Sequence, residues 1–190
     1  MRWPMWLARV LIGIGCACLA LFGIRWSASA SFQEAASQAL EGRLVAPAPE
    51  AEDGLVGRLE ISRLHLSVMV VDGDDEATLA RAVGHVRGTA LPWESGNAVL
   101  AGHRDTFFRP LRNLREGDEI RMTTTRGTFD YKVVATEIVE PDDVSVLAPS
   151  TRRSLTLITC YPFAYVGRAP QRFIIHAQEN DARPVSRPRQ

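Results

Sequence analysis

Cysteine is scarce in this sequence, and charge of neither sign is in excess. Three cysteines among 190 residues are too few for a disulfide framework, and their spacing offers no zinc-ligand pattern. Lysine plus arginine (22) equals aspartate plus glutamate (22), which argues against nucleic-acid binding, because that function needs a basic excess. Apolar residues, at 46%, are enough for a folded core. We therefore expect one small domain without metal or cofactor, whose function lies in local motifs.

The N-terminal residues are unlike the rest of the chain. No charged residue lies between Arg9 and Arg25, and tryptophans stand at both ends of this apolar run. Arg2 and Arg9 precede the run, whereas Arg25 alone follows it. This bias predicts a single-pass anchor in the cell membrane, with a cytoplasmic N-terminus and the remaining chain on the outer face. Alternatively, a signal peptidase could cut at the Ala-x-Ala pattern of residues 28–30 and release a secreted domain.

Composition divides the chain into four segments. We predict a membrane anchor over 1–26, a stalk or linker over 27–53, a folded domain over 54–178 and a disordered polar tail over 179–190. The stalk is rich in Ala, Ser, Glu and Pro and is expected to be a short helical or extended spacer between membrane and domain. The residues that carry function are therefore sought in the folded domain.

Apolar and polar residues alternate through the folded domain, as is typical of β-strands. Residues 74–83 form the one clear helical pattern, with acids in the first turn and Gly84 at the end. Seven or eight short strands with one helix predict a mainly β fold, a closed or nearly closed barrel. Strands are predicted over 57–61, 64–68, 97–101, 119–125, 128–139, 154–159 and 171–175.

Cys160 follows an apolar strand and precedes Tyr-Pro, so its thiol is expected at a strand-to-loop junction. An inert buried cysteine is the common alternative, but an unpaired thiol in an exported domain is a liability unless it is used. His103 follows another predicted strand. A cysteine–histidine pair suits acyl transfer, in which a thiolate attacks a carbonyl and an imidazolium protonates the leaving amine. Arg172 opens the next strand and is a candidate donor to the oxyanion, with a surface charge as the simpler alternative.

Three segments of this sequence resemble sortases. Thr-Leu-Ile-Thr-Cys, ending at Cys160, matches their Thr-Leu-x-Thr-Cys signature. Ala-Gly-His, ending at His103, matches the segment of their catalytic histidine, and Arg172 followed by Phe-Ile-Ile matches their catalytic arginine. The resemblance covers about 54–178 and is most similar to class D sortases, on Gly-His-Arg-Asp-Thr-Phe-Phe from residue 102 and Cys-Tyr-Pro-Phe from residue 160. It implies Cys160 as nucleophile, His103 as general acid and base, and Arg172 as oxyanion donor.

The resemblance also implies an activity and its partners. A membrane-anchored cysteine transpeptidase of this family would cleave an LPxTG-like sorting signal near the C-terminus of secreted proteins. A thioacyl-enzyme would then pass the protein to an amine acceptor of the cell envelope, for which a peptidoglycan precursor is expected. Ala101, Ile158 and Thr159 match positions that line the substrate groove in the family. The loop between Glu137 and Arg153 is expected to contact the front of the signal.

Two other functions are open on the sequence alone. The same three residues would serve an envelope cysteine peptidase that uses water as the acceptor. A non-catalytic, membrane-tethered β-domain that binds envelope proteins is the alternative from another class. Such a module has no need of a thiol at Cys160, which favours the enzyme.

Five further side chains have simpler interpretations. His65 is expected to be a wall residue of a strand, and His176 to be exposed near the end of the last strand. His85 could lie near the site or interact with a helix C-terminus. Asp105 could orient the neighbouring histidine or cap loop N–H groups, and Arg168 is expected in a loop, in contact with substrate or solvent.

Overall fold

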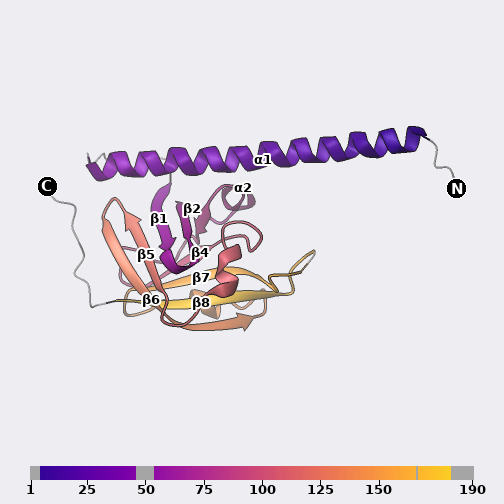
Figure 1. Cartoon of the computed structure of the whole chain (residues 1–190). Helices are drawn as coiled ribbons and strands as arrows, with labels where there is room; N and C mark the ends of the chain where they lie inside the picture. The colour runs from indigo at the N-terminus through magenta and orange to yellow at the C-terminus, as the bar shows by residue number, and fades with distance from the viewer. Residues whose placement is uncertain (1–4, 46–53, 166, 181–190) are drawn as a thin grey trace.

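The computed structural model describes residues 5–45, 54–165 and 167–180, which form one long helix and a β-barrel (Figure 1). Eight strands close the barrel in the order β1-β2-β3-β4-β7-β8-β6-β5, so the predicted mainly β, closed barrel is confirmed. The strands are β1 Leu55–Ile61, β2 Leu66–Asp72, β3 Val83–His85, β4 Asn97–Ala101, β5 Glu119–Thr124, β6 Gly127–Val139, β7 Ser154–Tyr161 and β8 Gln171–Glu179. The helices are α1 Met5–Val45 and α2 Glu76–Leu79, with 3-10 turns η1 Ser62–Leu64, η2 Arg109–Asn113 and η3 Val144–Leu147.

Most neighbouring strands run antiparallel, but β2 pairs with β3 and β4 pairs with β7 in parallel. Because the ring is closed, each strand forms backbone hydrogen bonds with a neighbour on both sides, and no strand is left as a free edge. The predicted hairpin at residues 126–127 is present, since β5 and β6 pair from Glu119 and Lys132 to Thr124 and Gly127. The β4–β7 pair matters most for the site, because parallel strands end at the same end of a barrel.

Alternate residues of the strands fill the barrel. Leu100 of β4, Leu155 and Leu157 of β7 and Ile175 of β8 are all at most 1% exposed and pack in one core. Each such side chain contributes roughly 1.5–3 kcal/mol by its removal from water. Since side chains alternate along a strand, the even-numbered residues of β7, Cys160 among them, face outward.

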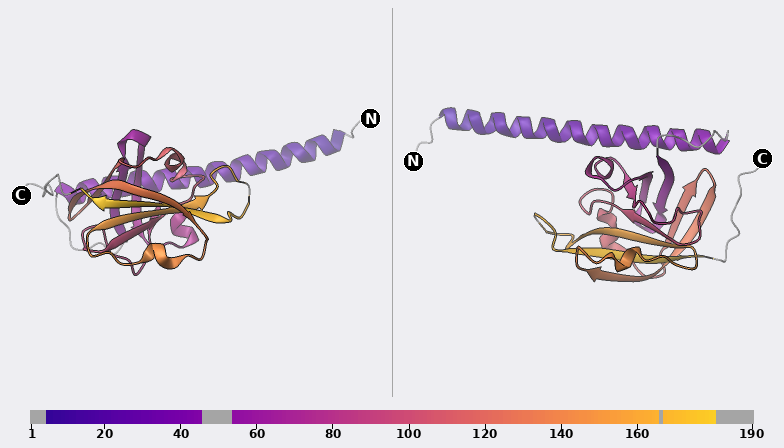
Figure 2. Two further views of the ribbon diagram at one scale, coloured as in Figure 1. Left: turned by 90° about the horizontal axis from the view of Figure 1, so that it is seen from below. Right: turned by 180° about the vertical axis from the view of Figure 1, so that it is seen from behind.

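Helix α1 continues without a break past the predicted boundary at residue 26 (Figures 1 and 2). In its N-terminal part, large apolar side chains such as Leu19, Phe22 and Trp26 are exposed. This part is long and apolar enough to cross a membrane. The predicted stalk is helical as far as Val45. Residues 1–4 and 46–53, and 181–190 of the predicted tail, lie outside the described residues.

The C-terminal part of α1 packs against the barrel. Ala36 and Leu40 form a buried cluster with Met69 of β2. The Gln33 side chain also accepts a hydrogen bond of 2.8 Å from the backbone N–H of Met69. The predicted stalk is thus, in this part, a helix docked on β1 and β2 rather than a free spacer.

The predicted helix over 74–83 is wrong in its extent. Helix α2 covers only Glu76–Leu79, and the Asp75 side chain caps it by accepting from the Thr78 N–H at 3.1 Å. Residues 83–85 instead form β3, beside β2. Strand pairing overrides the helical pattern here, because it buries Val83 inside the barrel.

Two further expectations are corrected at strand ends. His65 is not a wall residue of a strand: it follows η1 with φ of 50°, is exposed, and its N–H donates to Ser62 O at 3.1 Å. Asparagine, aspartate and histidine adopt this left-handed conformation more readily than other non-glycine residues. The predicted tail also begins too early, because β8 includes Glu179, and Asn180 N–H donates to Asp130 O at 2.8 Å.

Candidate active site

The parallel pair β4–β7 brings His103 and Cys160 to the same end of the barrel. Ala101 is the register partner of Ile158, and the Gly102 N–H donates to Ile158 O at 3.1 Å. His103 and Cys160 each lie two residues beyond that pair. Because neighbouring strands are about 4.8 Å apart, the two backbones run side by side at this point.

Arg172 lies on the other side of Cys160. The two residues are direct register partners in the antiparallel pair β7–β8, so their side chains leave the same face of the sheet. This is the outer face, because Leu155 and Leu157 point into the core. The structure therefore brings the three candidate residues together, from the adjacent strands or strand ends of β4, β7 and β8.

The Cys160 thiol is free and half-buried. The other two cysteines, Cys16 and Cys18, are exposed on the apolar part of α1. Cys160 is therefore the one thiol of the barrel, partly shielded from water yet open on the outer face. A nucleophile needs both properties, since it must meet its substrate in a poorly hydrated place.

The His103 ring is 34% exposed and lies beside helix α2. Its Nε2 atom is 3.8 Å from Oε1 of Glu76, whose side chain is 87% exposed. A carboxylate at this distance can pair with a protonated imidazole. Solvent screens so exposed a pair, which contributes about 0–1 kcal/mol. Glu76 was not singled out from the sequence, since only the fold places α2 beside the end of β4.

The Arg172 guanidinium is held at the start of β8. Its Nη1 donates to Gln171 O at 3.0 Å and more weakly to Ala169 O at 3.4 Å. Arg172 is half-buried, whereas Arg168, in the loop before β8, is exposed. The two arginines therefore differ as the sequence predicts, one fixed at the strand and the other in the solvated loop.

Arg104, directly after His103, is the residue that sequence reasoning missed. Its side chain is only 6% exposed and reaches into the loop between β7 and β8. Nη1 donates to Pro162 O at 2.7 Å, and Nη2 donates to Tyr165 O at 2.6 Å and Gly167 O at 3.3 Å. One buried guanidinium thus ties the segment of His103 to the loop that joins Cys160 and Arg172.

An aromatic cluster packs beside the site. Tyr161, directly after Cys160, contacts Phe163 edge to face and stacks on Phe173, with ring centroids 6.1 and 6.3 Å apart. Phe163 and Phe173 also meet edge to face at 5.5 Å. Such pairs contribute about 0.5–1.5 kcal/mol beyond their burial. The cluster joins the end of β7 to the start of β8.

The three residues predicted to line a substrate groove differ in position. Ala101 and Ile158 are half-buried register partners on the outer face, next to Cys160. Thr159 is only 2% exposed, and its hydroxyl donates to Gly102 O at 2.8 Å. Ala101 and Ile158 therefore form a surface, while Thr159 lies beneath it and fastens the end of β4 to β7.

The loop between β6 and β7 lies over the same outer face. Asn97, at the start of β4, donates from Nδ2 to Val146 O at 3.0 Å and Ala148 O at 3.2 Å. Its Oδ1 accepts from the Thr156 hydroxyl at 2.8 Å. Beneath the loop, a hollow of about 290 Å³ is lined by residues that include Ser145, Thr156 and His176. The loop predicted to contact substrate is thus fastened beside the outer face of β4 and β7.

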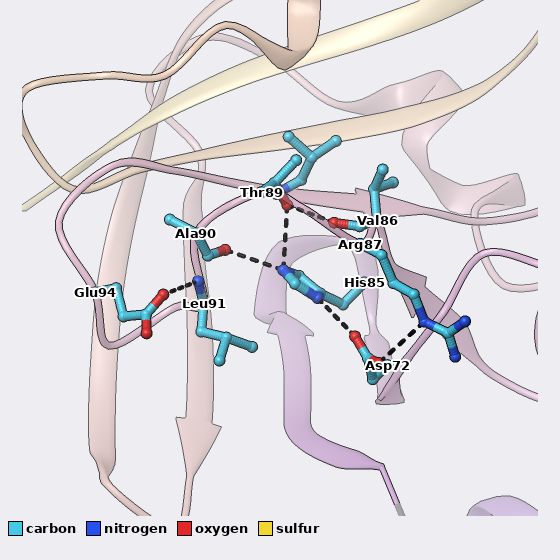
Figure 3. Close-up of polar contacts among 9 residues, drawn as sticks. Asp72, His85, Val86, Arg87, Thr89, Ala90, Leu91 and Glu94 are labelled. Atoms are coloured by element: carbon cyan, nitrogen blue, oxygen red, sulfur yellow. Dashed lines mark hydrogen bonds and ion pairs between the residues drawn. The ribbon is translucent and has the colours of Figure 1, made fainter.

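His85 belongs to a separate network (Figure 3). It lies buried in β3, with Nδ1 3.1 Å from Asp72 Oδ1 and Nε2 3.0 Å from Ala90 O. The Thr89 hydroxyl is 3.2 Å from Nε2. The contacts with Asp72, Thr89 and Ala90 engage both ring nitrogens. His85 therefore joins β2 to the β3–β4 loop, and the interpretation as a residue at a helix end is wrong.

The same network holds the Asp72 carboxylate. Partial burial raises the pKa of Asp72, but hydrogen bonds from His85 and Arg87 outweigh it and keep that pKa below its ordinary value. Arg87 Nε donates to Asp72 Oδ2 at 3.2 Å. The network therefore stabilises the ionised carboxylate at neutral pH.

The remaining polar candidates have surface roles. His176 is half-buried rather than exposed, with Nε2 2.8 Å from Glu137 Oε1. The exposed Asp105 carboxylate lies 3.5 Å from Arg104 Nε. Across residues 5–45, 54–165 and 167–180, no group of three His, Cys, Asp or Glu side chains is placed to hold a metal ion.

Comparisons with known proteins identify relatives of this chain. The family model of the sortase domain matches residues 59–180. The chain is 42% identical over 123 residues to sortase D of Bacillus subtilis, an alignment that covers 64% of this chain and 62% of that protein. It is 29% identical over 113 residues to sortase A of Listeria monocytogenes, which covers 57% of this chain and 50% of that protein. The matched part thus spans half to somewhat under two thirds of these relatives.

A solved structure of a Clostridium perfringens sortase D5 transpeptidase shares the fold. It superposes with a TM-score of 0.68 at 25% identity, covering 81% of this chain and 99% of that one. The match of sequence and the match of architecture therefore point to one group of proteins.

Proposed function

The chain belongs to the sortase family, and from this premise we propose that it is a membrane-anchored cysteine transpeptidase of the class D type. The observation that carries the proposal is the meeting of three strand ends: Cys160 and Arg172 share one face of β7 and β8, and His103 follows the end of β4 beside Cys160. Acyl transfer needs a nucleophile, a proton donor and an oxyanion donor within one small region.

In the first half-reaction, the Cys160 thiolate attacks the carbonyl carbon of the scissile peptide bond. The electron pair of the carbonyl moves to its oxygen, and the Arg172 guanidinium stabilises the resulting oxyanion. When the tetrahedral intermediate collapses, the C–N bond breaks and the His103 imidazolium donates its proton to the leaving amine. The product is a thioester between Cys160 and the N-terminal part of the substrate.

In the second half-reaction, an amine of the cell envelope replaces the sulfur. Neutral His103 accepts the proton of the attacking amine, the new amide bond forms, and the thiolate leaves. A peptidoglycan precursor is the proposed acceptor. Water in its place would give hydrolysis, so the ratio of the two products measures how well the site selects an amine.

The proposed substrate is a secreted protein with an LPxTG-like signal near its C-terminus. Ala101 and Ile158 offer an apolar surface next to Cys160 on which an extended peptide can lie. Thr159 would act from beneath, by holding the end of β4 in place through Gly102. The loop between Glu137 and Arg153 would contact the front of the signal.

We also propose that α1 anchors the chain in the cell membrane with a cytoplasmic N-terminus. Exposed apolar side chains along its N-terminal part need a lipid environment. Determining the N-terminal sequence of the membrane-extracted protein tests this. A start at Ser31 would show cleavage after residues 28–30 and contradict the anchor.

The chemical proposal is tested on the full chain in detergent, with a fluorogenic LPxTG-like peptide and mass analysis of the products. Cys160→Ala is expected to lower cleavage by at least about 10³-fold, as loss of a nucleophile does. Cys18→Ala is the matched control and should keep full activity, because it lies on α1. Cleavage by folded Cys160→Ala protein would contradict the proposal.

The histidine is tested in the same assay. His103→Ala should be nearly as damaging as loss of the thiol, because the leaving amine then lacks its proton donor. His65→Asn is the matched control, since asparagine also tolerates the left-handed conformation of that exposed turn. Full turnover by His103→Ala would assign the acid–base role to another group.

A further inference from the structure

The docked part of α1 fixes the direction in which the anchor leaves the barrel. Near its start, the Phe32 ring lies 4.8 Å under the guanidinium of Arg81, and Gln33 Nε2 donates to Arg81 O at 2.6 Å. Further along, Glu41 accepts from Arg58 of β1 at 2.9 Å. The helix therefore crosses from the β3 side to the β1 side, and its apolar N-terminal part continues past β3.

The loop between β7 and β8 points in this same direction. In all three views of Figures 1 and 2, it extends from the barrel toward the N-terminal half of α1, away from the β5–β6 turn. Cys160 lies just before this loop in the chain, and Arg172 lies just after it. The end of the barrel that holds the candidate active site is thus the end nearest the apolar helix.

The distance along α1 between its apolar run and its docked part is short. From Trp26, at the end of the apolar run, to Phe32, the first docked residue, there are six residues, or about 9 Å of helix at 1.5 Å per residue. A barrel fastened to a continuous helix at that level lies close to the membrane surface.

The β7–β8 loop contains residue types that are common at the membrane–water interface. Tyr165 is 45% exposed and Arg168 is exposed, and both side-chain types favour the membrane–water interface. The sequence from 154 to 178 contains no aspartate or glutamate that anionic lipids would repel. The bonds from Arg104 to the loop carbonyls hold this projection in place. The acidic side chains at this end, Glu76 beside His103 and Glu140 beside Gln171, lie on neighbouring segments and not in the loop itself.

We propose that the β7–β8 loop contacts the lipid headgroups of the membrane that holds α1, so that the candidate active site opens onto the bilayer surface. This inference rests on the anchoring proposed above.

The contact is measured on the full chain reconstituted in phosphatidylcholine–phosphatidylglycerol vesicles that carry a headgroup spin-label quencher. A fluorophore is attached at Tyr165→Cys or, as the matched control, at Thr125→Cys in the exposed β5–β6 turn, each with Cys16, Cys18 and Cys160 replaced. The label at position 165 should lose fluorescence and the label at 125 should keep it. Equal quenching at both positions, or none at 165, would overturn the proposal.

A longer helix provides the second test. Eleven helix-forming residues between Ala30 and Ser31 add about three turns, or roughly 16 Å, and keep the same helix face toward the barrel. Quenching at position 165 should then disappear, and quenching that persists would contradict a contact set by α1. In the active chain, the same insertion should leave cleavage of a soluble peptide unchanged. Failure of that cleavage in the parent chain would refute the proposed enzyme and leave the fluorescence result standing.

Discussion

Replacing Arg104 by alanine tests whether one buried guanidinium positions the loop between Cys160 and Arg172. The substitution removes three hydrogen bonds to loop carbonyls, two of them at 2.7 Å or shorter. It also removes the cation that lies 5.8 Å from the Tyr165 ring. The carbonyl oxygens that remain must turn toward water, and the loop must move for them to do so.

The size of the effect follows from these contacts. A hydrogen bond to a charged group contributes about 1.5–3 kcal/mol, so the two short bonds contribute roughly 3–6 kcal/mol before relaxation. Because the loop lies at the surface, water can replace part of this, and we expect the free energy of unfolding to fall by about 2–4 kcal/mol. A catalytic group misplaced by about 1 Å can cost 100-fold in rate, so kcat/KM should fall by roughly 10- to 100-fold.

The assay is peptide cleavage at a temperature where circular dichroism shows each variant fully folded. Arg168→Ala is the matched control, an exposed arginine of the same loop, and should lose less than about tenfold, as expected for a solvated charge. Arg104→Lys should recover only part of the rate, because an ammonium lacks the planar fork that reaches several carbonyls together. A fully folded Arg104→Ala protein with the parent kcat/KM would refute the positioning role.

Two more substitutions test the site and the barrel. Arg172→Ala should slow single-turnover acylation by about 100- to 1000-fold, as loss of an oxyanion donor does. Arg168→Ala should slow it by less than about tenfold, and Arg172→Lys should be only partly active. A greater loss in Arg168→Ala than in Arg172→Ala would contradict the assignment. The hydrogen bonds from the Arg63 side chain and from the Arg115 N–H lower the pKa of Asp118 despite its burial. Its contribution to stability is therefore full above about pH 4 and is lost as pH falls through the lower folded value. Urea unfolding across pH should show a shallower acid loss in Asp118→Asn, and an unchanged slope would contradict this coupling.

The barrel is predictable from sequence because strand alternation is a local signal, whereas β3 is not. Residues 74–83 carry acids before an apolar run, as a helix start does, and nothing local shows that Val83 pairs with Val70. The pairing buries both side chains inside the barrel, and burial outweighs a weak helical preference. The position of this segment in the barrel, rather than its local helical preference, decides that it forms a strand.

The docked helix and Arg104 show two different limits of prediction from the sequence. Phe32, Ala36 and Leu40 recur at four-residue spacing, a stripe that a search for helical periodicity would have found among the polar residues of the predicted stalk. Arg104 offers no such signal, since an arginine next to a histidine in a polar loop is normally solvated. Its burial exists only because three carbonyls, distant in sequence, converge on it in the folded chain.

The topology explains why motifs so far apart in sequence lie at one place. The β5–β6 hairpin and the loop after it lie between β4 and β7 in the chain, yet β4 and β7 are neighbours in the barrel and run parallel. An antiparallel pair would have put the ends that carry His103 and Cys160 at opposite ends of the barrel. The next pairing, β7 with β8, is antiparallel, and it returns the chain to Cys160 at Arg172. One parallel and one antiparallel pairing, in this order, are what gather a histidine, a thiol and a guanidinium at the end of the barrel nearest α1.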